Sequence, residues 1–220
     1  MKKRPWLVLV CLLIIVLLPI KTFAQKDGDW QFWNTVSGEK EINKELKIIL
    51  EEETRLGQSM GDFAYQHIDA GLLHPMTNWL DLSLNYRHIF QKKDNTWEDE
   101  ARPHFNATLK WQWLGLDFSN RNRMEYRILS KTKDSWRYRN MTKVKIPLDW
   151  SRFKISPYLA EEAFFNFDQD DFNRNRLSLG SEFKLVKNLQ GELYYLRQSS
   201  ESRGNWTDVN VLGTKLKLIF

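Results

Sequence analysis

The residues of this chain best suited to chemistry are arginines and glutamates placed at every second position. In one example, uncharged residues separate Arg121, Arg123, Glu125 and Arg127. Because successive side chains of a β-strand point to opposite sides, this spacing gathers the charges on one face. Charged faces that meet in an enclosed space form either a lattice of ion pairs that fills it or a basic lining that favours anions. The residues assigned to such faces are Glu51, Glu53, Arg121, Arg123, Glu125, Arg127, Arg137, Arg139, Glu162, Arg174, Arg176 and Glu182.

Patterns typical of catalysis are sparse. The four histidines show no metal-ligand spacing. His67 and Asp69 share one strand face, but chance produces such polar pairs readily in an alternating strand. Asp168 and Asp171 lie in a polar stretch that lacks the glycine and distal glutamate of an EF-hand loop. We therefore expect no enzymatic activity, no catalytic residues, no cofactor and no bound metal.

Period-two alternation of apolar and polar residues indicates the elements that carry these side chains. It runs through eleven segments: 29–37, 44–55, 63–73, 79–90, 102–113, 116–129, 136–148, 153–165, 174–185, 189–198 and 208–220. Many are about ten residues or longer, which a tilted strand needs to cross a bilayer, whereas strands of soluble proteins average ~5 to 6 residues. We predict an all-β fold: a transmembrane, antiparallel up-and-down β-barrel of ten to twelve strands. Bacterial single-chain barrels use an even count, so we expect ten or twelve rather than eleven.

The two faces of each segment indicate its surroundings. In residues 104–113 aromatic and aliphatic side chains alternate with polar ones, and the apolar set is rich in aromatics. We predict that the apolar faces contact lipid and that the charged residues named above line the lumen. Short turns such as 114–115 and 149–152 alternate with longer polar connections such as 91–101. Short turns are typical of the periplasmic side, which places the C-terminus in the periplasm.

The last nine residues form an alternating strand that ends on an aromatic residue. One face carries Leu212, Leu216, Leu218 and Phe220. An ordinary amphipathic edge strand would alternate in the same way. The segment nevertheless resembles the terminal signature of bacterial outer-membrane β-barrels. This resemblance implies that the four residues are an assembly signal read by the barrel assembly machinery, and that outer-membrane lipid is a partner.

The N-terminus has the order of a secretory signal peptide. Basic residues precede an apolar run to about Ile20, and residues 22–24 form a small-x-small cleavage site. A retained transmembrane helix is the alternative, but the run is short for a span of ~20 residues. We predict a signal peptide at 1–24 and a barrel domain at 25–220. Cys11 lies within the signal peptide, so the mature chain has neither a disulfide nor a thiol nucleophile.

Composition after cleavage excludes several classes of protein. Four of the 33 basic residues lie in 1–24, which leaves 29 against 28 acidic residues and lowers the net charge from +5 to +1. No basic surface therefore indicates nucleic acid as a partner. The mean hydropathy of −0.56 is polar, yet 14% of residues are aromatic. Half-apolar strands with aromatic girdles account for both values.

Short motifs spread over the mature chain extend the resemblance. They are Trp30-x-x-Trp33, Leu82-Ser-Leu-Asn-Tyr86, Arg121-x-Arg-x-Glu125-Tyr-Arg127, Glu162-Ala-Phe-Phe165, Asn175-Arg-Leu-Ser-Leu-Gly180 and the terminal Phe220. Together they resemble the DUF2490 family of outer-membrane proteins. The resemblance implies a β-barrel in the outer membrane of a Gram-negative bacterium and no established activity. We expect a closed or narrow barrel with a charged lumen and an unassigned role; the alternatives are a narrow channel for small anionic solutes and, with less support, an outer-membrane enzyme.

Overall fold

The described part of the chain folds into eleven β-strands. The structure, a computed structural model, describes residues 27–93, 96–148, 152–202 and 204–220. The strands are β1 (Asp29–Asn43), β2 (Leu46–Gly57), β3 (Asp62–Pro75), β4 (Leu80–Lys93), β5 (Thr96–Trp113), β6 (Leu116–Leu129), β7 (Ser135–Lys145), β8 (Ser156–Asn166), β9 (Asp171–Val186), β10 (Leu189–Ser202) and β11 (Asn205–Ile219). The predicted signal peptide, 1–24, lies outside the described residues. No helix in the described ranges is long and apolar enough to cross a membrane.

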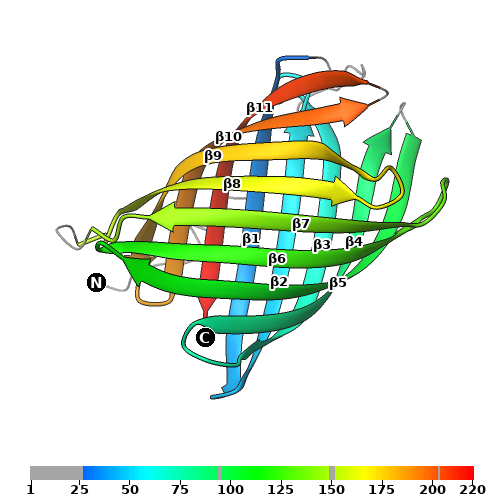
Figure 1. The fold of residues 1–220 in the computed structure, drawn as a ribbon. Coiled ribbons are helices and arrows are strands. Elements are labelled where there is room, and N and C mark those ends of the chain that lie inside the picture. Colours follow the sequence, from blue (N-terminus) through cyan, green and yellow to red (C-terminus); the bar gives the residue numbers. More distant parts are fainter. Residues whose placement is uncertain (1–26, 94–95, 149–151, 203) are drawn as a thin grey trace, which may run out of the picture.

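The strands form one closed barrel (Figure 1). Each strand pairs with its neighbours in the chain in antiparallel fashion, and β1 and β11 close the barrel as a parallel pair, from Asp29 beside Val209 to Glu39 beside Ile219. An odd number of consecutive antiparallel strands leaves the first and last pointing the same way, so their seam must be parallel. The prediction of ten to twelve strands is confirmed. The preference for an even count was wrong because a parallel seam removes the need for one.

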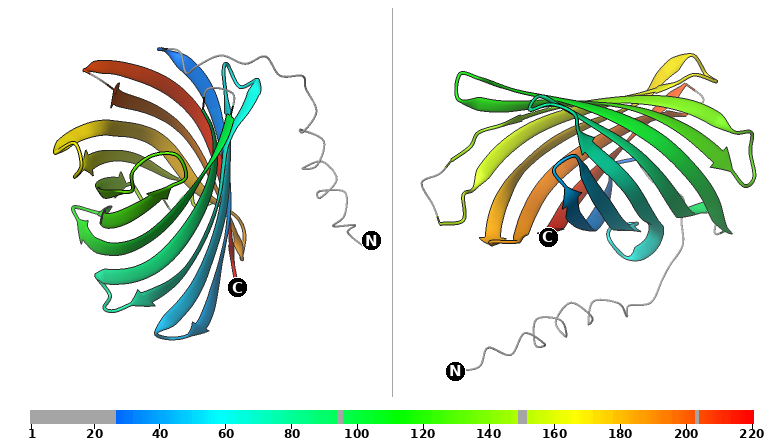
Figure 2. Two further views of the ribbon diagram at one scale, coloured as in Figure 1. Left: turned by 90° about the vertical axis from the view of Figure 1, so that its right-hand side faces the viewer. Right: turned by 90° about the horizontal axis from the view of Figure 1, so that it is seen from below.

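The strands tilt steeply around the barrel. In Figure 1, β6 to β9 cross the front almost horizontally while β1 and β3 run almost vertically behind them, and both views in Figure 2 show the sheet curling round. Tilt of this kind is required to close a sheet into a barrel. The end at which β11 and β1 finish is called here the Phe220 rim, and the end at which they begin is the Trp30 rim.

Connection lengths do not distinguish the two rims. The predicted long connection 91–101 is mostly strand, because β4 and β5 continue as a hairpin that pairs Lys93 with Thr96. β7 ends at Lys145 and β8 begins at Ser156, which is the widest interval between consecutive strands, and the predicted short turn at 149–152 falls within it. The expected contrast between short turns and long loops was therefore wrong. Strand ends that extend beyond the apolar band of the outer face do not need apolar side chains. Their sequences are therefore polar and resemble those of loops.

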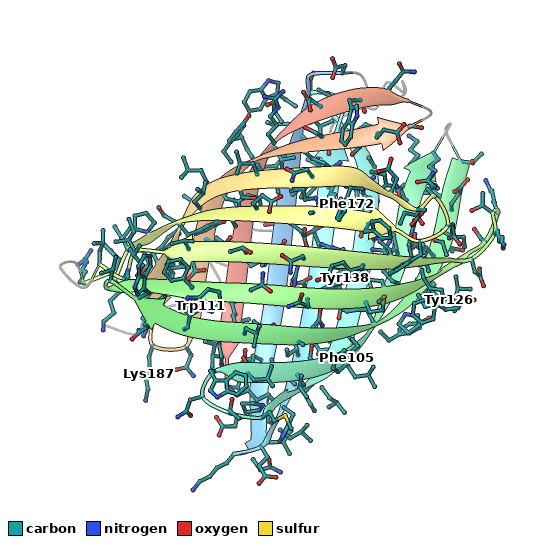
Figure 3. The ribbon with its side chains drawn as sticks, in the orientation of Figure 1. Phe105, Trp111, Tyr126, Tyr138, Phe172 and Lys187 are labelled. Atoms are coloured by element: carbon teal, nitrogen blue, oxygen red, sulfur yellow. The ribbon has the colours of Figure 1, made fainter. Side chains whose placement is uncertain are left out.

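Many large apolar side chains are exposed on the outer surface, with aromatic residues at both rims. Trp30, Trp97, Trp136 and Trp206 are exposed near the Trp30 rim, and Trp79, Trp111 and Trp113 near the Phe220 rim. Figure 3 places Tyr126 and Trp111 near opposite ends of the front strands, with Phe105 and Tyr138 between. Ring contacts link neighbouring strands: Trp111 stacks on Phe118 at 5.3 Å, and Tyr126 lies 4.9 Å from Trp136.

One sector of the interior is apolar. Trp33, Leu196, Val209 and Val211 form a buried cluster beside the seam, with Tyr194 packed against it. Trp30 and Trp33 are an odd number of positions apart, so one faces outward and the other inward. The interior is thus charged over most of its circumference and apolar next to β1 and β11, a division that the predicted charged lumen did not include.

Candidate functional site

The centre of the barrel interior is occupied by Glu125, whose side chain is 0% exposed. Its Oε2 accepts hydrogen bonds from Nη2 and Nε of Arg137, at 2.6 and 2.8 Å, and its Oε1 accepts one from Arg139 at 2.9 Å. Arg123 and Arg102 lie 3.5 and 3.8 Å from the same carboxylate. The register explains the cluster, because Glu125 pairs with Arg137 and Arg123 with Arg139 on adjacent strands.

A second carboxylate, Glu162 on β8, joins three strands. It lies 2.7 Å from both Arg121 and Arg139 and 3.4 Å from Arg176. Arg139 donates to Glu162 and also to Glu125, so the two carboxylates belong to one network. Hydrogen bonds between charged groups are about twice as strong as neutral ones, and a shared arginine fixes both partners.

A third group lies on β2, β3 and β4. Arg87 donates to Asp69 at 2.8 Å and to Glu51 at 3.1 Å. The ring of His67, which is completely buried, lies 3.2 Å from Glu51 and 3.1 Å from the Tyr65 hydroxyl. These bonds hold the inward side chains of three consecutive strands together.

Sequence reasoning missed several members of the network. Glu100 binds Arg102 at 2.6 Å and Arg127 at 2.9 Å, yet residues 91–101 were expected to be a loop. The signal was present, because Glu100 and Arg102 lie an even number of positions from His104, the first polar residue of the alternating stretch 104–113. Arg87 was also missed, although it shares the polar face of the predicted segment 79–90 with Ser83 and Asn85.

Aromatic rings also contact several of the guanidinium groups. Phe164 is buried, with the guanidinium groups of Arg137, Arg139, Arg174 and Arg176 between 4.5 and 5.6 Å from its ring centroid. Arg55 lies 3.7 Å from the ring of Trp33. Cation–π contacts of this kind contribute most where water is excluded.

The twelve predicted lumen residues do not all belong to one cluster. Arg121, Arg123, Glu125, Arg127, Arg137, Arg139, Glu162 and Arg176 connect through shared partners, and Glu51 lies in the Arg87 group. Glu53 pairs with Arg55 at 2.5 Å. Arg174 donates to Ser200 at 3.0 Å and, among the described residues, contacts no carboxylate. Glu182 lies apart, near the Phe220 rim.

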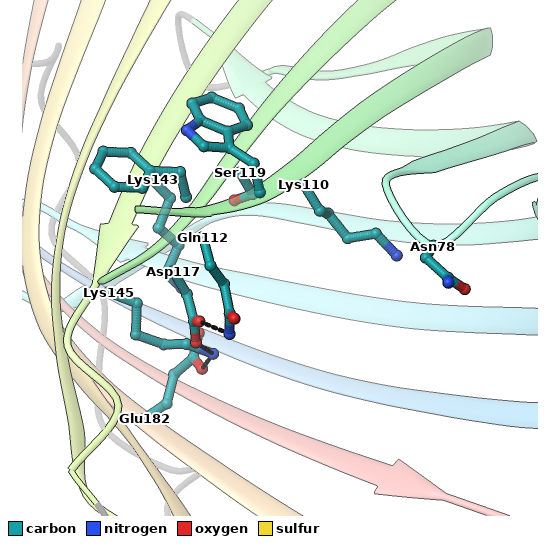
Figure 4. A pocket seen from close by; sticks show the side chains of 10 residues that line it. Asn78, Lys110, Gln112, Asp117, Ser119, Lys143, Lys145 and Glu182 are labelled. Carbon is teal, nitrogen blue, oxygen red and sulfur yellow. Dashed lines mark hydrogen bonds and ion pairs between the residues drawn. The ribbon is translucent and has the colours of Figure 1, made fainter. Parts of the chain in front are cut away.

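Glu182 borders a recess of about 550 Å³ at the Phe220 rim (Figure 4). Lys143 and Lys145 lie 2.5 and 3.2 Å from its carboxylate, and Gln112 donates to Asp117 at 2.8 Å. The lysines of the recess are thus paired, which leaves its walls close to neutral.

The structure does not assemble the His67 and Asp69 pair. The carboxylate closest to His67 is that of Glu51, whereas Asp69 binds Arg87 and lies 3.5 Å from His104. Within the described ranges no cluster of three or more His, Cys, Asp and Glu residues could hold a metal ion.

A G-x-S-x-G pattern at residues 57–61 also escaped the sequence reasoning. In serine hydrolases this motif forms a strand-to-helix elbow with a base beside the serine. Here it forms the turn between two antiparallel strands, and Gln58, Ser59 and Met60 all have positive φ. The backbone N–H of Ser59 donates to Asp29 at 2.9 Å. The motif therefore serves as a tight turn tied to β1.

The four residues of the predicted assembly signal share the outer face of β11. Leu212, Leu218 and Phe220 are exposed and Leu216 is half-buried. The backbone of Phe220 donates to Glu39 at 2.9 Å and accepts from Glu41 at 3.3 Å, which secures the end of the seam.

A closed barrel with an apolar outer face and an ion-paired interior is the architecture of outer-membrane β-barrels. Residues 30–209 match the family described as "Protein of unknown function (DUF2490)", and the chain belongs to this family.

Solved structures of other proteins are similar to this chain at low sequence identity. LpxR from Salmonella typhimurium has a TM-score of 0.50 and 8% identity over 79% of this chain and 83% of that one. The anion-selective porin from Comamonas acidovorans has a TM-score of 0.39 and 10% identity over 77% of this chain and 55% of that one, so the chain spans about half of the porin. No curated protein matches the sequence.

Proposed function

We propose that this chain is a membrane-spanning barrel of the Gram-negative outer membrane whose interior is closed by ion pairs. The exposed apolar outer face and the tryptophans at both rims support membrane insertion. In this proposal residues 1–24 direct export and are removed, and the outer face of β11 is read by the assembly machinery. The barrel acts as a structural or scaffolding element and carries out no catalysis.

The main support for a closed interior is the complete burial of Glu125 among four arginines. A carboxylate in an open aqueous lumen would keep exposed surface. Here arginines of β5, β6 and β7 enclose the Glu125 carboxylate instead. Narrow barrels fill with side chains in this way.

Fractionation of cells and gel mobility test the membrane part of this proposal. The protein should partition with the outer membrane and migrate as a heat-modifiable band, because a closed barrel leaves no unpaired strand edge in lipid. Recovery as a soluble periplasmic protein without detergent would refute it.

A narrow conduit for small anions is the second candidate, and the surplus of arginine favours it. Arg174 contacts no carboxylate in the described residues, and Glu125 and Glu162 are each shared among several arginines. Basic side chains along a pore lower the barrier for anions. If the conduit is open, replacing Arg123 and Arg139 with Glu should move the reversal potential toward cations. An unchanged reversal potential would exclude the arginines as its lining.

A further inference from the structure

The outer face of the barrel carries a polar patch between its two rims. Asn122 donates to Asn120 at 2.8 Å, Asn140 donates to Asn122 at 2.9 Å, and Asn120 donates to Thr142 at 2.9 Å. These residues alternate with the inward-facing arginines of β6 and β7, so they face outward. Glu161 on β8 and Asn175 on β9 continue the patch and hydrogen-bond to each other. The six residues are called here the amide patch.

The amide patch lies at mid-height. Asn122, Asn140 and Glu161 are each close to the middle of their strands, which span 116–129, 135–145 and 156–166. The neighbours of Glu161 on the same face, Leu159 and Leu177, are 51% and 50% exposed. If the barrel spans the membrane as proposed above, the patch faces the hydrocarbon layer. Polar groups are costly there.

Glu161 makes this placement unusual. Its parity with Leu159 puts its carboxylate outside the barrel, where its hydrogen-bond donor is the amide of Asn175. No arginine or lysine contacts it among the described residues, in contrast to every carboxylate at the barrel centre. An ionisable side chain facing lipid without a cation is rare, and such groups normally face protein or water.

We propose that the amide patch is the interface between two copies of this chain. Two copies inserted in the same orientation are related by a two-fold axis along the membrane normal, which brings residues of equal height together. The patch has a carboxylate acceptor on β8 and amide donors on β6 and β7 at one height. A two-fold axis therefore sets Glu161 of each copy against the asparagines of the other.

Hydrogen-bond chemistry favours a second copy over lipid as the occupant. Asparagine amides both donate and accept, so a patch rich in them is complementary to itself. Acyl chains offer neither donors nor acceptors. Side-chain hydrogen bonds between membrane segments also promote association. The outer face of β3 and β4, with Ile68, Leu72, Leu84 and Tyr86 exposed, is suited to lipid instead.

Crosslinking in intact outer membranes tests the interface. Ala163 lies beside Asn140 on one side and Asn175 on the other, so an Ala163→Cys variant reports on the patch without altering it. Ala70→Cys, an outward position on β3, is the matched control. The chain's single native cysteine, Cys11, lies in the predicted signal peptide. With a short bis-maleimide we expect a covalent dimer from Ala163→Cys, roughly tenfold more abundant than from Ala70→Cys.

A second variant distinguishes loss of the interface from loss of folding. Replacing Asn122, Asn140 and Glu161 with Leu in the Ala163→Cys background should abolish the dimer while the heat-modifiable band persists. The inference is overturned if Ala163→Cys crosslinks no better than Ala70→Cys in correctly inserted barrels, or if it links only to a different protein. If the triple variant fails to fold, the comparison of Ala163→Cys with Ala70→Cys still tests the interface. Loss of membrane insertion in the wild type would instead refute the proposed function on which this inference rests.

Discussion

Arg137 donates two hydrogen bonds to one oxygen of Glu125, at 2.6 and 2.8 Å, in the middle of the barrel. The two residues pair in register on β6 and β7, and Glu125 has no exposed surface. Removing one partner leaves the other charge buried without compensation. The contact therefore stabilises the fold, and in the proposed function it also helps to close the interior.

Replacing Glu125 with Gln should lower the free energy of unfolding by ~3 to 5 kcal/mol, because four arginines lose their shared counter-charge. The fraction of heat-modifiable barrel across a urea series measures this change. Glu98→Gln is the control, since Glu98 pairs with the exposed Lys93 near the Trp30 rim and should alter stability little. Equal stability of the two variants would show that Glu125 is not held in a buried network.

The parallel seam predicts a specific crosslink. Asn34 and Thr214 are partners in register, and Thr214 donates to Asn34 at 2.7 Å on the outer face. A cysteine pair at these positions should form an internal link under oxidation, detected as faster migration after boiling without reductant. The pair Asn34 and Asn210 should not link, because four residues of strand separate the partners by ~13 Å. A link in the second pair alone would mean a different register or an even-stranded barrel.

Much of the fold was predictable because period-two alternation is a local property. Each of the eleven predicted segments corresponds to one strand, and the Arg and Glu positions at 121–127 face inward by parity alone. Strand ends were less predictable, as at 91–101, because polar strands and polar loops share a composition. The direction of the seam depends on closure of the whole sheet, which no local window contains.

The membership of the charged clusters was also only partly predictable. Parity gives the face of a residue, but its partner depends on register between strands distant in the sequence, such as Glu162 with Arg121. Trp33 and Phe164 face inward although apolar residues were expected to face lipid. Trp33 contacts Arg55 and Phe164 contacts Arg174, and these contacts depend on how the strands pair, which no local pattern shows.

Deleting Phe220, or replacing both Leu218 and Phe220 with Asp, should prevent assembly. These side chains are exposed on the outer face, and the backbone of Phe220 bonds to β1 at the end of the seam. The outcome is measured as loss of the heat-modifiable band and accumulation in the periplasm. Val186→Asp, an exposed position at the same rim, should assemble normally. Normal assembly of the Phe220 deletion would remove the C-terminal residue from the assembly signal.

Gly213 should tolerate no side chain. A Cβ there would lie 2.0 Å from Cζ of Tyr194, which packs across the glycine beside the seam. Gly213→Val should therefore lower the free energy of unfolding by ~1 to 3 kcal/mol through overpacking. Gly38→Val is the matched control, because a Cβ at Gly38 would meet nothing within 4 Å. Combining Gly213→Val with Tyr194→Ala should recover part of the loss, and no recovery would argue against the close approach.

Conductance of the purified protein in planar bilayers tests the closed interior most directly. We expect wild-type barrels, inserted and heat-modifiable, to show no steady conductance, because in the proposed closed barrel Glu125, Glu162 and the arginines that pair with them fill the interior. Glu125→Gln, which weakens that filling, should remain silent or show only brief openings. A steady, anion-selective conductance from the wild-type protein would contradict the closed barrel and establish the conduit in its place.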